Sequence, residues 1–188
     1  MAIVGVLALQ GDFEAHRKAL ERAGAEAVEV RTASDLDSID GLVIPGGESS
    51  TMLRLLGLEN MFEALREFGL RKPVFGTCAG TILLARKVSN PAQASLGLMD
   101  MEVERNAYGR QLDSHVARLQ AEGGELEAVF IRAPIIRKLG PSVQVLASHN
   151  GDPVLVDDGR HMAATFHPEL SEDPRVHALF LARVSGGV

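Results

Sequence analysis

Apolar and polar residues alternate along the chain in blocks that are typical of buried strands and amphipathic helices. Residues 3–9 are continuously apolar, which indicates a parallel strand buried on both faces. Asp12 is well suited to cap the helix that follows, and Gly24 is well suited to end it. Within this helix His16 falls at the same helical spacing as the apolar residues Phe13, Ala15, Ala19, Leu20 and Ala23.

The same alternation continues to residue 45. Two more strands, at residues 27–30 and 41–45, are expected on either side of a short helical turn at residues 35–39. A succession of strand, helix, strand, helix and strand predicts an α/β sheet with right-handed crossovers.

The rest of the chain predicts a few more helices and a larger number of strands. Helices are expected from about residue 51, over residues 58–68, from Cys78 to about Arg86, and over residues 173–184. The expected strands are residues 74–75, 99–104, 114–119, 126–132, 143–147, 153–156 and 161–166, with a loop at 106–110. Asp158-Gly159 is typical of a hairpin turn between the last two strands. No repeat or linker interrupts the pattern, so one domain is expected over residues 1–188.

Composition narrows the classes of function. The 188 residues carry 25 acidic and 19 basic side chains, and no basic tract is interleaved with aromatics, so nucleic-acid binding is not expected. No apolar stretch approaches the ~20 residues of a membrane span, and the first residues lack the features of a signal peptide. A single cysteine excludes an internal disulfide and fits the reducing cytoplasm. The six histidines are scattered rather than placed at zinc spacing, so neither a metal nor a cofactor is expected.

The strongest chemical signal is the single cysteine, Cys78, which Gly76 and Gly80 flank between an apolar strand and an apolar helix. This is the pattern of a nucleophile elbow, with sulfur in place of the serine oxygen. Such a turn would hold the sulfur at the N-terminus of a helix, where a thiolate is favoured. Because most lone cysteines are small buried apolar residues, the interpretation as a nucleophile requires a base.

A histidine and a carboxylate near the other end of the chain can supply this base. In an extended segment at the end of the last strand, His167 and Glu169 would project from the same side and Pro168 would face away. The carboxylate would then orient the imidazole, as the third member of a catalytic triad does. An isolated His-x-Glu is ordinarily structural, and only its combination with Cys78 predicts catalysis.

A glycine-rich loop, Pro-Gly-Gly-Glu-Ser-Ser, covers residues 45–50 after the third strand, and Ser49 or Ser50 could cap the next helix. Two adjacent glycines can turn their N–H groups outward to receive an anion, although a plain turn is their commoner meaning. Ligands of open α/β sheets bind beyond the carboxyl ends of the strands, which favours a binding role for this loop.

Together these motifs resemble the class I, or triad, glutamine amidotransferases. The general resemblance is carried by residues 76–80 and 167–169, which contain Cys78, His167 and Glu169. Five segments are also similar to the glutaminase subunits of pyridoxal 5′-phosphate synthases: residues 6–11, 45–49, 103–111, 130–134 and 166–173. The resemblance covers nearly the whole chain and implies a three-layer α/β sandwich with a mostly parallel, flavodoxin-like central sheet.

The resemblance implies hydrolysis of L-glutamine to L-glutamate and ammonia through a cysteine thioester. Cys78 would be the nucleophile, His167 the base and Glu169 the residue that orients it. The implied oxyanion donors are the N–H groups of Gly47 and Ala79. The implied glutamine-binding residues are Gly47, Glu48, Ser49, Arg105, Ile131 and Arg132.

A separate synthase subunit would receive the ammonia, because one α/β domain leaves no residues for a synthase. The resemblance also implies low activity until that subunit docks, and a flip of the Gly46–Gly47 peptide would provide the gate. Three other interpretations stay open: an amidotransferase subunit of another pathway, a cysteine hydrolase or chaperone-like protein of similar topology, and an inactive scaffold. Release of glutamate from glutamine would separate the glutaminases from the other two.

Overall fold

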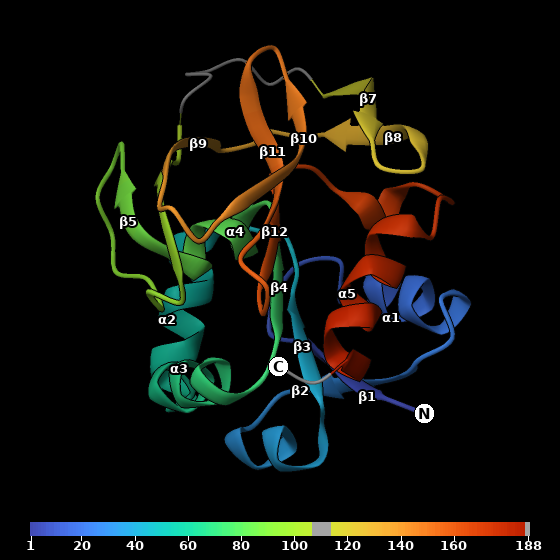
Figure 1. Ribbon diagram of the computed structural model, residues 1–188. Helices are drawn as coiled ribbons and strands as arrows, with labels where there is room; N and C mark the ends of the chain where they lie inside the picture. Colours follow the sequence, from blue (N-terminus) through green and yellow to red (C-terminus); the bar gives the residue numbers. More distant parts are fainter. Residues whose placement is uncertain (107–113, 187–188) are drawn as a thin grey trace.

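Seven strands form the central sheet in the computed structural model, which describes residues 1–106 and 114–186 (Figure 1). Their order is β10-β11-β12-β4-β3-β1-β2. Their bounds are β1 Ile3–Leu7, β2 Glu26–Val30, β3 Gly41–Ile44, β4 Val74–Thr77, β10 Gln144–His149, β11 Asp152–Asp157 and β12 Met162–Ala164. The pairings from β12 to β2 are parallel, whereas β10 and β11 extend the sheet in antiparallel fashion. The mostly parallel sheet is therefore confirmed, and its parallel part has the strand order of flavodoxin-like folds.

Helices cover both faces of this sheet and complete three layers (Figure 1). Their bounds are α1 Phe13–Arg22, α2 Ser49–Leu58, α3 Phe62–Arg71, α4 Ala79–Leu84 and α5 Arg175–Gly186, with 3₁₀ helices η1 Ala33–Ser38 and η2 Pro168–Leu170. One apolar cluster packs α2, α3 and α4 on one face through Met52, Phe68 and Leu83. A second cluster packs α1 and α5 on the other face through Leu20 and Phe180.

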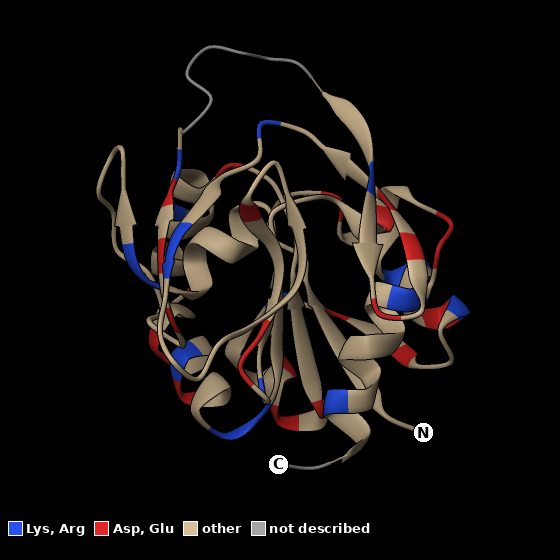
Figure 2. Ribbon diagram, turned by 45° about the horizontal axis from the view of Figure 1, so that its top comes forward, with Lys and Arg blue, Asp and Glu red and all other residues tan. Residues whose placement is uncertain are grey.

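The innermost strands β1, β3, β4 and β12 carry no charged residue (Figure 2). Their side chains are buried by helices on both faces, which explains why the sequence shows continuous apolar runs instead of alternation. Parallel strands place their carboxyl ends at one edge, so the loops after β3, β4 and β12 meet there. No helix in the described part of the chain is both long and apolar enough to cross a membrane.

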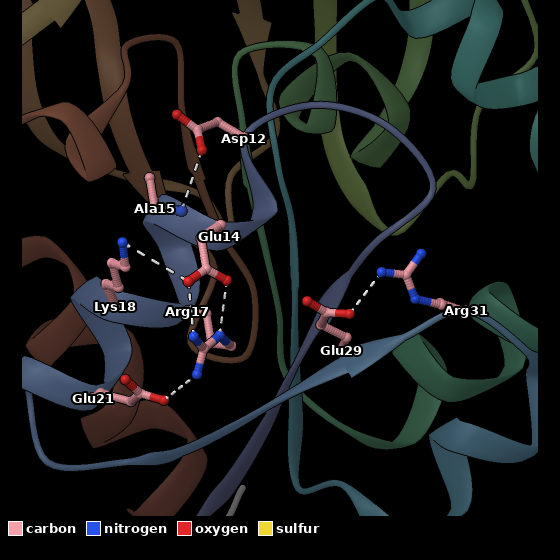
Figure 3. Close-up of polar contacts among 8 residues, drawn as sticks. All are labelled: Asp12, Glu14, Ala15, Arg17, Lys18, Glu21, Glu29 and Arg31. Carbon is pink, nitrogen blue, oxygen red and sulfur yellow. Dashed lines mark hydrogen bonds and ion pairs between the residues drawn. The ribbon is translucent and has the colours of Figure 1, made fainter.

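Helix α1 is amphipathic and is fixed at its start by a cap. The Asp12 carboxylate accepts a hydrogen bond from the N–H of Ala15 at 3.2 Å, so the expected cap is confirmed (Figure 3). On the outer face, the Arg17 guanidinium donates to Glu14 and to Glu21, each at 2.7 Å (Figure 3). Exposed pairs of this kind contribute little to stability. The inner face buries His16, Ala19 and Leu20.

Two smaller sheets lie beside the central one. They contain β5 Ala85–Ser89, β6 Met99–Glu104 and β9 Ile135–Leu139 in one sheet, and β7 His115–Ala121 with β8 Gly124–Phe130 in the other. Strands β6, β7 and β8 confirm the expected strands to within two residues. Strands β5 and β9 were not predicted. Most of the loop expected at residues 106–110 lies outside the described residues.

The structure corrects the expected helix from Cys78 to Arg86, because α4 ends at Leu84. The N–H groups of Leu96 and Leu98 donate to the carbonyls of Leu83 and Leu84, at 2.7 and 3.0 Å. These carbonyls are the orphan acceptors at the end of a helix, so the returning chain satisfies them and the backbone continues as β5.

The helix expected over residues 58–68 is also wrong in its bounds, since a break at Asn60 separates α2 from α3. Asn60 has a φ of 55°, the left-handed conformation that commonly ends a helix. Neither serine caps α2. The Glu48 carboxylate accepts hydrogen bonds from the N–H groups of Ser50 and Thr51 at 3.2 and 2.7 Å, and Ser49 is already helical.

Candidate active site

Cys78 occupies a sharp turn between β4 and α4, with φ 50° and ψ −107°. Residues other than glycine are strained in this region, and such strain is found mostly at functional sites. The turn is held because the N–H of Cys78 donates to the carbonyl of Ala164 at 2.8 Å. The cysteine therefore sits at the N-terminus of α4 and at the carboxyl edge of the sheet.

Two close approaches explain the glycines on either side. A Cβ on Gly76 would lie 2.5 Å from the carbonyl oxygen of Gly80, and one on Gly80 would lie 2.1 Å from that of Ile44. Both distances are far shorter than a van der Waals contact with rigid backbone. The glycines let strand and helix approach closely enough for the elbow to form.

Gly80→Ala is expected to destabilise the protein by at least about 3 kcal/mol, because the backbone of β3 or α4 must move. For a chain of this size the melting temperature would fall by about 6–12 °C. Gly57→Ala is the matched control, since a Cβ on this helical glycine meets no atom within 4 Å and should stabilise α2 slightly. Thermal unfolding of both variants tests the close approach, and a Gly80→Ala protein that melts like the wild type would contradict it.

His167 lies between Cys78 and Glu169. Its Nδ1 lies 2.6 Å from Oε1 of Glu169, and its ring and the Cys78 side chain meet at Gly46, where an added Cβ would lie 2.6 Å from Cε1 of His167 and 3.2 Å from Cβ of Cys78. The expected extended geometry is wrong, because β12 ends at Ala164 and Pro168 begins the 3₁₀ turn η2. The turn, which Pro168 favours by its fixed φ, brings the Glu169 carboxylate within hydrogen-bond distance of the imidazole.

The surroundings of His167 favour its charged form. Burial opposes the charge, but hydrogen bonds to Cys78 and Glu169, and the negative charges of both, raise the pKa of His167 to about 10. An imidazolium beside sulfur stabilises a thiolate. The sulfur also lies 3.8 Å from the carbonyl oxygen of Ile131, which places the segment after β8 at the nucleophile.

The glycine loop packs directly on the triad. A Cβ on Gly46 would lie 2.6 Å from Cε1 of His167 and 3.2 Å from Cβ of Cys78, so only glycine fits here. The carbonyl of Gly46 faces Gly11, whose own Cβ would lie 1.8 Å from that oxygen. Because the N–H and C=O of a trans peptide point in opposite directions, the N–H of Gly47 faces away from Gly11.

Glu48 and Arg105 meet across the loop. Arg105 Nη2 lies 3.3 Å from Glu48 Oε1, and the Arg105 side chain is only 12% exposed. Burial opposes the Glu48 charge, yet hydrogen bonds from Ser50 and Thr51 lower the pKa of Glu48 to about 2. The ionised Glu48 carboxylate therefore holds the Arg105 side chain beside the glycine-rich loop.

The other predicted residues lie around the same edge. Ser49 is buried, with its hydroxyl 3.3 Å from Oε1 of Gln93. Ile131 is 37% exposed, Arg132 is exposed with a φ of 46°, and Ala79 opens the first turn of α4. The structure gives no contact that assigns the oxyanion role to Gly47 or Ala79, so this role stays a prediction.

Sequence reasoning gave Gln10 no role in the site and named Gly46 only as part of the gating peptide. Gln10 accepts a hydrogen bond from the N–H of Glu48 at 3.0 Å and so supports the loop from β1. Gly46 is the residue in contact with His167, whereas the family resemblance pointed to Gly47. The signals were present, since Gln10 directly follows the first apolar run and both glycines are adjacent, but neither shows which atoms meet.

Comparison with known proteins gives relatives over almost the whole chain. A pyridoxal 5′-phosphate synthase subunit PdxT of Solibacter usitatus is 59% identical, covering 98% of this chain and 100% of the relative. The PdxT subunit of Thermotoga neapolitana is 50% identical, covering 96% of this chain and 98% of that protein. At these levels of identity, and with nearly complete coverage, the relatives share the whole architecture and not one motif alone.

Comparison with solved structures gives the same fold. A crystal structure of a glutamine amidotransferase superposes with a TM-score of 0.89 at 46% identity, covering 97% of this chain and 98% of that one. A GMP synthase protein from Thermoplasma acidophilum, at 18% identity and a TM-score of 0.70, shares the fold and covers 98% of this chain and 93% of its own. The family model of the SNO glutamine amidotransferases matches residues 6–185. This chain belongs to the SNO glutamine amidotransferase family.

Proposed function

We propose that this chain is a glutaminase subunit that hydrolyses L-glutamine to L-glutamate and ammonia and delivers the ammonia to a pyridoxal 5′-phosphate synthase subunit. The observation that carries the proposal is His167 held beside the Cys78 side chain at Gly46 and hydrogen-bonded to the Glu169 carboxylate at 2.6 Å. The PdxT relatives support the pathway. Residues 1–188 act as one glutaminase domain, in the cytoplasm.

The first half of the reaction forms a thioester. The Cys78 thiolate attacks the side-chain amide carbon of glutamine, and the C–N bond breaks as His167 gives its proton to the leaving nitrogen. Glu169 holds His167 in the tautomer that presents Nε2 to the sulfur and stabilises the imidazolium. Ammonia leaves, and the glutamyl group stays on sulfur.

The second half returns the enzyme to its starting state. His167, now neutral, takes a proton from water, the resulting oxygen nucleophile attacks the thioester carbon, and the C–S bond breaks to release glutamate. Both halves pass through an oxyanion. The N–H groups of Ala79 and Gly47 receive it, each contributing about 3 kcal/mol.

Glutamine is bound by the glycine-rich loop at residues 45–50 and by Arg105, which contacts Glu48 of that loop. Arg105 binds the α-carboxylate, because a guanidinium presents two parallel donors to a carboxylate. Gly47, Glu48 and Ser49 line the pocket, together with Ile131 and Arg132. Glu48 serves in two ways, since its ionised carboxylate caps α2 and orients Arg105.

The synthase subunit completes the active site by turning the Gly46–Gly47 peptide. In the chain alone the carbonyl of Gly46 faces Gly11. Reorienting this peptide would exchange the directions of its carbonyl oxygen and the Gly47 N–H, which changes the donors around the site, and glycine tolerates both conformations at small cost. Unpartnered protein would therefore hydrolyse little glutamine, which avoids waste of the substrate.

Glutamate release is expected to be about 100-fold faster with the cognate synthase than without it, which is the effect of one oxyanion donor. The measurement is coupled detection of glutamate over a range of glutamine concentrations, with and without synthase. Cys78→Ala added with the same synthase is the control for contaminating glutaminases.

Each result has a distinct meaning. Equal rates of glutamate release with and without synthase would contradict the gating by the Gly46–Gly47 peptide but would still support the glutaminase activity. No glutamate under either condition would contradict the proposed function and favour a cysteine hydrolase or scaffold of this topology. Activity with a different ammonia acceptor, and none with this synthase, would assign the chain to another pathway.

A further inference from the structure

A line of buried polar side chains continues from the triad into the core. Oε2 of Glu169, the oxygen that does not contact His167, lies 3.2 Å from Nε2 of His16 on α1, within the distance of an ion pair, and no described group makes a hydrogen bond to this oxygen. The other ring nitrogen of His16 lies 2.9 Å from Nε2 of His177 on α5. His16 and His177 have no exposed surface, and the glutaminase chemistry uses neither of them.

Both of these histidines are neutral at pH 7. Burial, followed by the charges of His177 and His167, lowers the pKa of His16 well below its usual value. Burial and the charge of Arg22 lower the pKa of His177 to about 4. Each ring therefore carries one N–H and one lone pair, and the position of each proton decides what the pair can do.

Only one arrangement of the two protons suits the surroundings. If His16 carries its proton on Nε2, the N–H faces the Glu169 carboxylate, and its Nδ1 accepts from Nε2–H of His177. The hydrogen bond of this Nε2 is to the Thr77 hydroxyl at 3.1 Å, and the Glu169 carboxylate lies beside it. The reverse arrangement would turn a lone pair toward the carboxylate.

The far end of the line favours the same arrangement. Nδ1 of His177 is buried and has no hydrogen-bond partner among the described residues. In the reverse arrangement this atom would be an N–H without an acceptor, and a buried unpaired donor is costly. In the favoured arrangement it is a lone pair next to apolar atoms.

We propose that His16 is a positioning residue for the triad. Its Nε2 edge lies 3.2 Å from Oε2 of Glu169, and the positive end of this polar ring steadies the carboxylate while the opposite oxygen accepts the proton of His167 Nδ1; His177 fixes the tautomer of His16. The carboxylate side chain is only 1% exposed, so water cannot replace a lost donor. Helix α1, far from Cys78 in the chain, thereby sets the orientation of the catalytic base.

This inference deepens the proposed glutaminase function and rests on it. His16→Leu removes the donor at similar volume, whereas His16→Gln offers an amide N–H near the position of Nε2. Removing a polar partner from a buried charged group costs about 10- to 100-fold, so kcat for glutamine with the synthase present should fall by that factor in His16→Leu. KM should stay unchanged, and His16→Gln should recover most of the loss.

A second readout does not depend on glutamine. The rate at which iodoacetamide alkylates Cys78, followed against pH, reports the imidazolium beside the sulfur. His16→Leu should slow alkylation near pH 7 and His16→Gln should not. His161→Asn is the matched control, because it removes another buried histidine, whose Nδ1 accepts from the N–H of Val74, outside this line. Its alkylation profile should match the wild type.

Nitrogen-15 spectra of the histidine rings test the wild-type protein directly, so the inference can be judged even if His16→Leu does not fold. The expected result is a proton on Nε2 of both His16 and His177 at pH 7. A proton on Nδ1 of His16 would overturn the proposal, and so would equal losses in the leucine and glutamine variants. A wild type that alkylates and titrates as expected but releases no glutamate would contradict only the glutaminase function.

Discussion

Cys78→Gly is expected to abolish glutamine hydrolysis and, at the same time, to make the protein more stable than Cys78→Ala. Both variants remove the sulfur, so each should lose at least about 10⁴-fold in kcat. They differ in backbone strain. With φ 50° and ψ −107°, residue 78 occupies a region where any Cβ costs about 1–3 kcal/mol and glycine costs little.

The difference between the two variants measures the strain stored in the elbow. Glycine also loses more backbone entropy on folding, which offsets part of the gain. We therefore expect a net advantage of about 1 kcal/mol, or roughly 2–4 °C in melting temperature. Binding to the synthase, followed by sedimentation, should be retained in both. Equal melting temperatures would show that the turn is unstrained, and residual turnover above background would remove Cys78 from the reaction.

His167→Asn is expected to lower kcat by about 10⁴-fold, as loss of the base does in other triads. Its second effect is on the sulfur. Because the pKa of His167 is about 10, the wild-type imidazolium persists through neutral pH and is lost only as the pH rises toward that value. Removing it leaves the thiolate without its cation, so alkylation of Cys78 at pH 7 should slow by at least about 10-fold.

The pH profile separates this effect from general damage. The wild type should be alkylated faster than His167→Asn at pH 7, and the difference between the two rates should shrink as the pH rises toward 10 and the imidazolium is lost. Glu169→Gln keeps the imidazole and removes the neighbouring charge, so its profile should lie between the two. An unchanged profile in His167→Asn would mean that the histidine does not contact the reactive sulfur in solution.

The local elements were predictable because they depend on short-range patterns. Continuous apolar runs predicted β1, β3 and the strand before the elbow, and Asp12 predicted the start of α1. The end of α4 was not predictable, because it depends on N–H groups of Leu96 and Leu98 that arrive from a later segment. The strand β9 was missed for the same reason, since its short run Ile135–Leu139 has meaning only beside β6.

The three proposed catalytic residues show both what the sequence predicted and what it did not. Residue types and motifs were enough to select Cys78, His167 and Glu169, because few side chains can serve as nucleophile, base and orienting acid. The geometry that joins the last two was predicted wrongly, since the extended segment expected at Pro168 is a 3₁₀ turn.

By itself the sequence determined the α/β class and the family resemblance, it selected the residues proposed to carry the chemistry, and it placed His16 among the apolar positions of its helix. Only the tertiary structure decided what that buried face of α1 meets. The 3.2 Å contact between Glu169 and a ring more than a hundred residues earlier in the chain depends on the docking of α1 against β4 and η2. Periodicity records which side of a helix is buried, whereas the partner of each buried atom is set by the packing of the whole chain.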